Sequence, residues 1–184
     1  KCPIQISAGC AIYPKDGLTY NELNKYADYS LQYAKDNGKN KLTFFSNYIL
    51  EHKMRSLEIL KYIRESVSDD YRGFELNYQP QVEVSSKQIK GVEALLRWQC
   101  QELGKVSPVE FIPILEESGL IIPVGLWVIK KAIQACSKWV VYDPEFSVSI
   151  NVSALQMLNS DFVKDVKKVL KKEKLAPKNI VLEL

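Results

Sequence analysis

The sequence predicts an α/β protein, because strand-like and helix-like segments alternate along most of its 184 residues. From Asp69 onward, runs with every second residue apolar take turns with runs whose apolar residues recur every three or four positions. This order favours β–α units and a mostly parallel sheet. Residues 1–46 read separately as strand, helix and strand, and residues 47–68 as one helix. We therefore expect two regions joined by a helical linker.

In the first region, residues 4–13 begin with alternating apolar and polar side chains, which predicts a strand. Residues 1–7 read like the middle of a β-hairpin that is entered partway through a domain. Thr19 and Glu22 have the spacing of a capping box, so a helix is expected to begin there. Gly38 is expected to end it, because glycine readily adopts the left-handed conformation found at helix ends. A second strand is predicted from residues 42–45.

The second region, residues 69–184, holds the predicted sheet. Its strands are expected around residues 74–79, 91–98, 146–153 and 180–184, and its helices around residues 108–118, 124–141 and 161–174. Ser107 and Glu110 have the spacing of a second capping box, with proline at the first helical position. The lysines of the last helix are interpreted as a solvated face and not as a membrane- or nucleic-acid-binding surface.

Composition argues against several classes of protein. A net charge of +3 is small for a nucleic-acid-binding protein, which usually carries a basic patch, so no nucleic-acid partner is expected. The four cysteines form no Cys-x-x-Cys pair, and the single histidine lacks the imidazole partner of a zinc site. No apolar run reaches the roughly 18 residues of a membrane span. We expect a cytoplasmic protein with reduced thiols, whose membrane anchor, if it has one, lies outside this stretch.

Glu93 and Arg97 stand four residues apart in the predicted strand at residues 91–98. Because a strand directs alternate side chains to the same face, the two share one face. A carboxylate and a guanidinium arranged in this way suit a site that holds a metal ion and a phosphate together. A structural ion pair between the two side chains is the alternative interpretation.

Asn151 and Glu183, like Glu93, occur near the ends of predicted apolar strands. In parallel β/α architectures, functional groups gather at the C-terminal ends of the strands. Two carboxylates and an amide carbonyl supply oxygen ligands only, a set that favours Mg²⁺ or Mn²⁺ over zinc. Taken singly, each of the three residues is also explained as an ordinary polar position at a strand end.

Five motifs then occur in the order seen in EAL domains, the phosphodiesterases and receptors of the bacterial second messenger cyclic di-GMP. They are Tyr78-Gln79-Pro80-Gln81-Val82, Gly91–Trp98, Ser107–Pro113, Ser149–Gln156 and Ile180–Leu184. Residues 69–184 therefore resemble the first half of an EAL-type (β/α)8 barrel. Because a closed barrel needs about 250 residues, we expect the chain to be a fragment of a longer protein.

The resemblance implies roles for five residues. Glu93, Asn151 and Glu183 match the ligands of the catalytic Mg²⁺ or Mn²⁺ ions, Arg97 matches a phosphate contact, and Gln79 matches a substrate contact. The implied reaction is metal-dependent hydrolysis of cyclic di-GMP to linear pGpG. The family's catalytic lysine and remaining metal-binding aspartates belong to later motifs. We therefore expect no catalytic residue within this chain and no activity from the 184 residues alone.

Residues 1–46 resemble the C-terminal end of a GGDEF domain, the diguanylate cyclase fold. The matching motifs are Ser7-Ala8-Gly9, Tyr13-Pro14-Lys15-Asp16-Gly17 and Tyr33–Asn40. The resemblance maps two nucleotide-binding residues onto Lys35 and Lys39, although the helix dipole alone also favours lysines near a helix end. The cyclase's metal-binding aspartate and its Gly-Gly-Asp/Glu-Glu-Phe loop are expected before residue 1, so these residues cannot support cyclase activity.

Two alternatives to a phosphodiesterase remain open. A non-catalytic receptor would bind cyclic di-GMP through degenerate GGDEF and EAL domains, whereas an unrelated β/α metalloenzyme would not bind a guanine dinucleotide. The presence of Glu93, Asn151 and Glu183 together favours the enzyme. The oligomeric state is also open, and a homodimer is one of the assemblies that the sequence allows.

Overall fold

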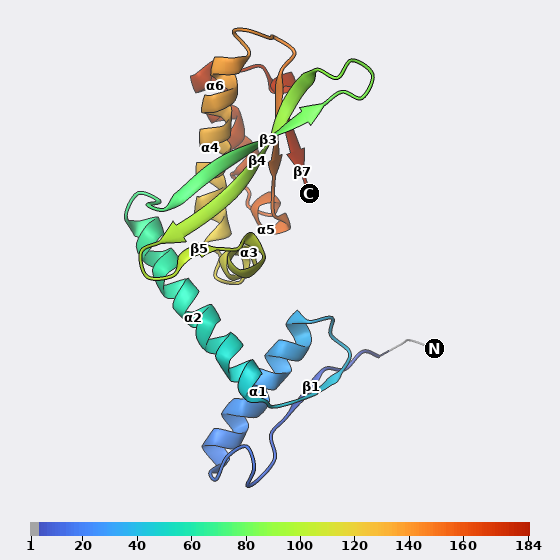
Figure 1. Ribbon diagram of the computed structural model, residues 1–184, viewed down its shortest axis with the longest axis vertical. Helices are drawn as coiled ribbons and strands as arrows, with labels where there is room; N and C mark the ends of the chain where they lie inside the picture. The colour runs from blue at the N-terminus through green and yellow to red at the C-terminus, as the bar shows by residue number, and fades with distance from the viewer. Residues whose placement is uncertain (1–3) are drawn as a thin grey trace. The chain divides into compact units, whose positions relative to one another are not determined.

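The computed structural model describes residues 4–184 and divides the chain into two compact units, residues 1–58 and residues 59–184. The division falls inside one long helix, α2 (Asn47–Ser68), which is coloured cyan to green in Figure 1. The first turns of α2 therefore belong to the first unit and its last turns to the second. The helix predicted over residues 47–68 is confirmed.

The first unit is built from β1 (Ala8–Cys10), α1 (Tyr20–Asp36), β2 (Leu42–Phe44) and the start of α2. β1 and β2 pair in parallel, and the first strand is shorter than the predicted residues 4–13. The hairpin expected at residues 1–7 lies partly outside the described residues and stays a prediction. A parallel pair needs a crossover, which α1 provides. β1 packs closely against α1 at Gly9. Any side chain at this position would place its Cβ atom 2.0 Å from the carbonyl oxygen of Ala27, so only glycine fits there.

The capping box of α1 is confirmed. The backbone N–H of Glu22 donates to Thr19 Oγ1 over 3.2 Å, and the N–H of Thr19 donates to Glu22 Oε2 over 3.0 Å. Backbone hydrogen bonds from Leu18 and Thr19 lower the pKa of the Glu22 carboxyl group. Gly38 follows the helix with a φ of 103°, the left-handed conformation that was predicted for it.

The second unit contains one five-stranded sheet in the order β3-β4-β6-β7, with β5 paired to β4 (Figure 1). Its strands are β3 (Phe74–Val82), β4 (Ile89–Cys100), β5 (Gly104–Val106), β6 (Ser147–Asn151) and β7 (Ile180–Glu183). β6 runs parallel to both β4 and β7, whereas β3 and β5 are antiparallel to β4. The predicted mostly parallel sheet holds for β4, β6 and β7 but not for β3, and β5 was not predicted. Residues 83–88, between β3 and β4, are too few for a parallel crossover and allow only a hairpin.

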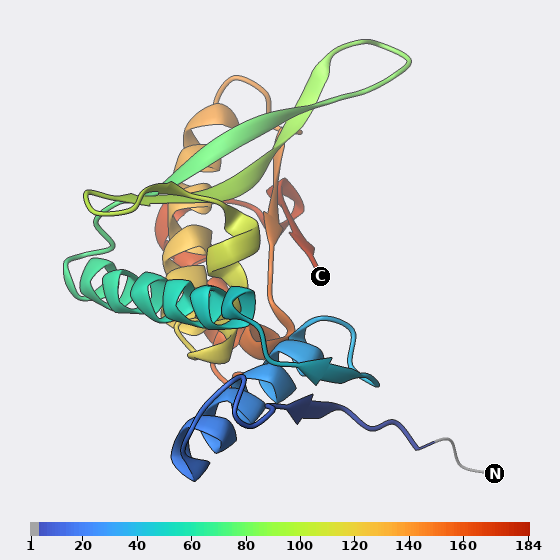
Figure 2. The same ribbon diagram turned by 60° about the horizontal axis from the view of Figure 1, so that its bottom comes forward.

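Helices connect the parallel strands and cover one face of the sheet. They are α3 (Pro108–Glu117), α4 (Ile121–Trp139), α5 (Ala154–Met157) and α6 (Phe162–Glu173), followed by the short 3-10 helix η1 (Pro177–Asn179). Figures 1 and 2 both show α4 and α6 lying side by side behind the sheet. Ser107 precedes α3 as expected, but its hydroxyl makes no capping hydrogen bond, so that capping box is wrong.

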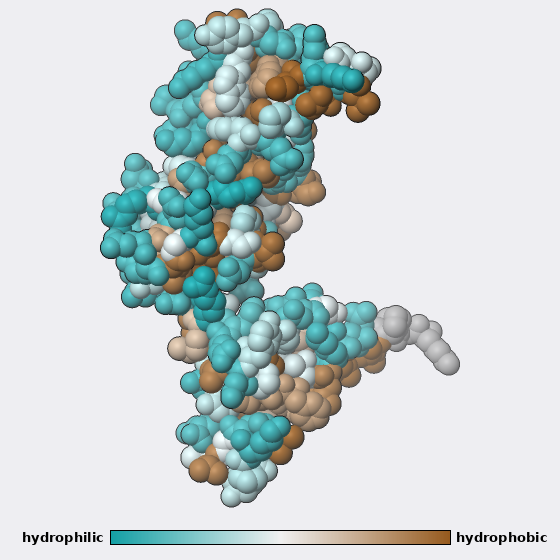
Figure 3. Space-filling model, viewed as in Figure 1, coloured by the Kyte–Doolittle hydropathy of each residue, from teal (hydrophilic) through white to brown (hydrophobic). Residues whose placement is uncertain are grey.

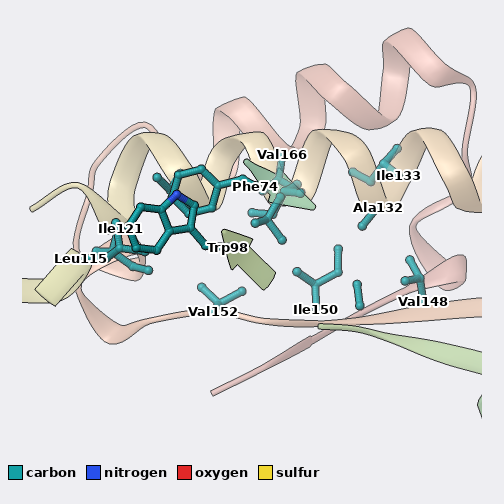
Figure 4. Packing of buried hydrophobic residues seen from close by; sticks show 14 of the residues in the cluster. Phe74, Trp98, Leu115, Ile121, Ala132, Ile133, Val148, Ile150, Val152 and Val166 are labelled. Atoms are coloured by element: carbon teal, nitrogen blue, oxygen red, sulfur yellow. The ribbon is translucent and has the colours of Figure 1, made fainter. Parts of the chain in front are cut away.

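The hydrophobic core lies between these helices and the sheet. Trp98, Phe111 and Ile150 are at most 2% exposed, and Figure 4 shows how Trp98 and Phe74 pack beneath α4. The indole Nε1–H of Trp98 donates to Ser66 Oγ over 3.0 Å, which satisfies a donor that burial would otherwise leave unpaired. Ser66 belongs to α2, so the last turns of that helix are fixed to the second unit.

Two surface features complete the description. The end of the β3–β4 hairpin keeps apolar side chains in solvent, with Val84 92% exposed, and Figure 3 shows brown surface gathered there. Among the described residues, 4–184, the helices are too short or too polar for any of them to cross a membrane.

Candidate metal and phosphate site

The two faces of the sheet in the second unit differ in chemistry. Residues opposite one another in paired strands share a face. Gln79 lies opposite Glu93, Glu93 opposite Ser149, and Asn151 opposite Glu183. These residues therefore lie on the face away from the helices, which we call the polar face. Its polar members are Glu75, Asn77, Gln79, Gln81, Glu93, Arg97, Ser149, Asn151 and Glu183.

Glu93 and Asn151 contact each other on the polar face. The side-chain amide Nδ2 of Asn151 donates to Glu93 Oε1 over 2.7 Å, although the two residues are 58 positions apart in the sequence. This hydrogen bond uses the amide N–H group, so the amide oxygen and the second carboxylate oxygen both remain as acceptors. The pair therefore offers two oxygen ligands held in a common orientation.

Glu183 joins this pair through the neighbouring strand. β7 is parallel to β6, and Glu183 pairs in register with Asn151 at the last residue of each strand. Just beyond, the backbone N–H of Val152 donates to the carbonyl of Glu183 over 2.7 Å, which extends the pairing past the strand end. The structure therefore brings the three predicted metal ligands to adjacent strands on the polar face. Asn151 and Glu183 end their strands as expected, whereas Glu93 lies within β4 and not near its end.

Arg97 lies further along β4. Four residues of strand separate it from Glu93, which corresponds to about 13 Å between their Cα atoms. Its Nη1 donates to the carbonyl of Leu96 over 2.9 Å, and within residues 4–184 its guanidinium forms no ion pair with a carboxylate. The structural ion pair between Glu93 and Arg97, considered as an alternative above, is therefore absent from the described part of the chain.

A cavity of about 250 Å³ connects Arg97 with the strand ends. Arg97, Asn151 and Glu183 line it together with apolar side chains from β4, α3 and α4. Glu93 adjoins the cavity through its hydrogen bond to Asn151, while Gln79 lies opposite Glu93 on β3 and is exposed. Because Arg97, Asn151 and Glu183 line the same cavity, one bound molecule could contact the guanidinium and the oxygen ligands together.

The oxygen ligands of this site suit a hard divalent cation. Glu93, Asn151 and Glu183 provide carboxylate and amide oxygens, the donors that Mg²⁺ and Mn²⁺ prefer. Within residues 4–184, no cluster of three or more His, Cys, Asp or Glu side chains is arranged to hold a metal. A cation bound by these three residues would complete its coordination with water or with substrate oxygens, which is common for Mg²⁺.

Sequence reasoning missed three side chains at this cavity: Glu116, Ser153 and Gln156. The hydroxyl of Ser153 donates to Glu116 Oε1 over 2.6 Å, and the N–H of Ser153 donates to Gln156 Oε1 over 3.1 Å. Ser153 and Gln156 do have capping-box spacing, a signal that was available in the sequence. The partnership with Glu116 spans 37 positions and leaves no local pattern.

The two lysines predicted in the first unit are both exposed. Lys35 lies in the last turn of α1, but Lys39 lies beyond the helix end with a φ of 55°. The i, i+4 geometry of a helix therefore does not apply to this pair.

Comparison with known proteins identifies the family. The family model described as "EAL domain" matches residues 62–184, well over half of the chain. The chain belongs to the EAL domain family. That match begins within α2 and includes every strand of the sheet with the polar face.

Similar full-length proteins extend the likeness to both units. The bifunctional diguanylate cyclase/cyclic di-GMP phosphodiesterase MucR of Pseudomonas aeruginosa is 34% identical over 182 residues, which is 98% of this chain and 26% of MucR. Signaling protein YkoW of Bacillus subtilis is 36% identical over 97% of the chain and 22% of its own length. The chain thus spans about a quarter of the curated relatives that it matches.

Solved EAL structures share the fold of the second unit. The complex named PaMucR phosphodiesterase with c-di-GMP has a TM-score of 0.64 at 32% identity, covering 69% of this chain and 51% of that one. The EAL enzyme Bd1971, in its form bound to cAMP and cyclic-di-GMP, has a TM-score of 0.63 at 34% identity, covering 71% and 36%. These likenesses support an α/β assignment with EAL-domain neighbours.

Proposed function

We propose that this chain carries the first part of the active site of a cyclic di-GMP phosphodiesterase, which hydrolyses cyclic di-GMP to linear pGpG with Mg²⁺ or Mn²⁺. The observation that carries the proposal is the gathering of Glu93, Asn151 and Glu183 on adjacent strands beside a cavity that also contains Arg97. The relatives named as phosphodiesterases, MucR and PdeR, support the same reaction.

In this proposal each residue has a distinct part. Glu93, Asn151 and Glu183 hold the cation, and the Asn151 amide N–H keeps the Glu93 carboxylate in one orientation. Arg97 binds a phosphate oxygen of the substrate, and exposed Gln79 contacts the substrate next to Glu93. A divalent cation bound there would activate water and stabilise the charge that develops on the phosphate.

Arg97, Asn151 and Glu183 line one cavity, so one phosphate-containing substrate could contact both the guanidinium and a cation held by the oxygen ligands. The choice of a cyclic dinucleotide as that substrate rests on the relatives named as cyclic di-GMP phosphodiesterases.

The proposal also covers the arrangement of domains. Residues 1–46 would form the end of a GGDEF domain, residues 47–68 a helical linker, and residues 69–184 the first half of an EAL-type barrel. Support comes from relatives such as MucR, which match over both units, and from the position of the unit division within α2. Lys35 and Lys39 would then be remnants of a nucleotide site, without cyclase activity of their own.

The decisive experiment compares a protein that carries the complete domain with its Glu93→Ala variant and with the 184-residue chain. We expect formation of linear pGpG from cyclic di-GMP by the complete protein with Mg²⁺ or Mn²⁺, and none by the variant or by the 184 residues. Binding of cyclic di-GMP without turnover by the complete protein would instead support a non-catalytic receptor. Failure to bind a guanine dinucleotide at all would point to an unrelated metalloenzyme.

A further inference from the structure

A second carboxylate faces the cavity from the helical side of the unit. Glu116 is the next-to-last residue of α3, is half-buried, and lines the same cavity as Asn151 and Glu183. Within residues 4–184, no lysine or arginine forms an ion pair with it. Its one hydrogen bond to another side chain comes from Ser153. Charge pairing therefore does not account for a carboxylate at this position.

The bond between Ser153 and Glu116 has the geometry of a strong interaction. Its length, 2.6 Å, lies in the range of a hydroxyl that donates to a charged carboxylate. The bond joins α3 to the turn between β6 and α5, two segments that local structure does not connect. It therefore fixes the position of this turn relative to the helices.

Asn151 is the residue immediately before this turn. Only Val152 separates Asn151 from Ser153. Val152 and Ser153 each form hydrogen bonds to residues in other parts of the unit. The N–H of Val152 donates to the carbonyl of Glu183, while Ser153 bonds to Glu116 and Gln156. The side chain of Gln156 is buried against α4. Gly125 of that helix leaves room for it, because a side chain there would place its Cβ atom 2.0 Å from Gln156 Nε2. The turn after Asn151 thus has little freedom to shift.

The Asn151 side chain, by contrast, is exposed and held by one hydrogen bond to Glu93. The direction in which its amide oxygen points therefore depends on this bond and on the position of the backbone that carries Asn151. We infer that Glu116 is a positioning residue, which acts through Ser153 to fix the end of β6 and so to orient Asn151 toward the cation. This inference rests on the proposed function for the role of the cation.

Glu117, the next residue of α3, provides a matched control. It is exposed and lies beside Glu116 on the same helix, and the Ser153 hydroxyl bonds to Glu116 and not to Glu117. Glu116→Met and Glu117→Met make the same chemical change at adjacent positions. Only the first removes the acceptor of the Ser153 hydroxyl, so effects shared by both variants reflect lost charge or altered helix propensity.

The test uses a protein that carries the complete domain, with Mn²⁺ as the probe and, before any metal is added, the side-chain NH₂ resonances of Asn151 as the reporter. In Glu116→Met we expect these resonances to shift and the Mn²⁺ dissociation constant, measured by electron paramagnetic resonance titration, to rise about tenfold. In Glu117→Met we expect no shift and an unchanged dissociation constant. Glu116→Gln keeps a neutral acceptor, so most of the Mn²⁺ affinity should return.

Several outcomes would overturn the inference. Unshifted Asn151 resonances in Glu116→Met would do so whether or not the protein binds Mn²⁺. An equal loss of affinity in Glu116→Gln would assign the effect to charge and not to position. If the wild-type protein bound no Mn²⁺, the metal site of the proposed function would be contradicted, while the resonances would still decide the role of Glu116.

A double variant gives an independent check. Ser153→Ala removes the same hydrogen bond and also the cap of α5, so it should lose at least as much Mn²⁺ affinity as Glu116→Met. Because the two substitutions break one shared interaction, their combination should lose no more affinity than Ser153→Ala alone. Additive losses would show that Glu116 does not act through Ser153.

Discussion

The two faces of the sheet in the second unit are formed by the same strands but have different roles. On β4, Ala94 and Trp98 are 3% and 2% exposed and pack beneath the helices, whereas Glu93 and Arg97 alternate with them on the polar face. The helix-covered face contains nearly all of the buried apolar surface, and the polar face contains the predicted ligands. Neighbouring residues of one strand therefore have different roles: those on the helix-covered face stabilise the core, and those on the polar face are the candidate ligands.

The largest change in activity should come from replacing Glu93 on the polar face. In a protein that carries the complete domain, Glu93→Ala should lower the rate of cyclic di-GMP hydrolysis by about a thousandfold or more, because a lost metal ligand removes several kcal/mol of transition-state stabilisation. Chromatographic measurement of linear pGpG tests this, with Glu117→Ala as a control of equal charge change. Unchanged activity in Glu93→Ala would refute the metal assignment.

The next test contrasts two adjacent residues of β6. Ile150 is fully buried, and Asn151 is exposed. Ile150→Ala should lower the free energy of unfolding by about 2–5 kcal/mol, because it leaves a cavity in the core. Asn151→Ala should change it by less than about 1 kcal/mol. Urea unfolding followed by tryptophan fluorescence reports on the second unit, where all three tryptophans lie; equal losses in both variants would contradict the division of roles.

A smaller loss of unfolding free energy is expected from breaking the buried hydrogen bond between Trp98 and Ser66. Ser66→Ala would leave the indole N–H of Trp98 buried without a partner, which should cost about 1–3 kcal/mol of unfolding free energy. Ser68→Ala, in the same helix and the same unit but with an exposed hydroxyl, should cost less than about 0.5 kcal/mol. Equal values for the two serines in the same unfolding assay would show that the Trp98 hydrogen bond adds nothing.

The last prediction concerns pH. Cys136 is fully buried on the helix side, and burial raises the pKa of its thiol from 9.0 to about 11. The unfolded chain loses this proton near pH 9 and the folded chain near pH 11, so the unfolded state binds fewer protons between those values. The thiol's contribution to stability is therefore complete below pH 9 and is lost as pH rises toward 11.

The Cys136→Ala variant isolates this contribution from other alkaline titrations, including that of Tyr78, whose pKa burial also raises. We expect the unfolding free energy to fall less between pH 8 and pH 11 in the variant than in the wild type. An identical fall in both proteins would contradict the assignment to the thiol.

The elements that the sequence predicted well are those determined by local patterns. The capping box of Thr19 and Glu22, the helix over residues 47–68 and the alternation along β4 all depend on residues close together in the chain. Alternation also placed Glu93 and Arg97 on one face, as the register confirms. It could not show whether the two side chains form an ion pair, and within residues 4–184 Arg97 forms none with a carboxylate.

Strand direction and long-range contacts were not predicted. Alternation looks the same in parallel and antiparallel strands, so β3 was assigned wrongly, although the short connection at residues 83–88 carried the needed signal. Ser107 has the spacing of a capping box, but its hydroxyl makes no such bond. The contact between Glu116 and Ser153 depends on how α3 packs against β6, which no local pattern encodes.

The uninterrupted pairing of β4 has a consequence for protein engineering. From Gly91 to Trp98 the strand is in continuous register with β3, so odd and even positions never exchange faces. Deleting one residue between Gly91 and Glu93 would act like a frameshift: Trp98 would turn outward, and Arg97 would turn into the core. Libraries that vary residues by substitution can therefore explore one face at a time, whereas single-residue insertions or deletions would change catalysis and folding together.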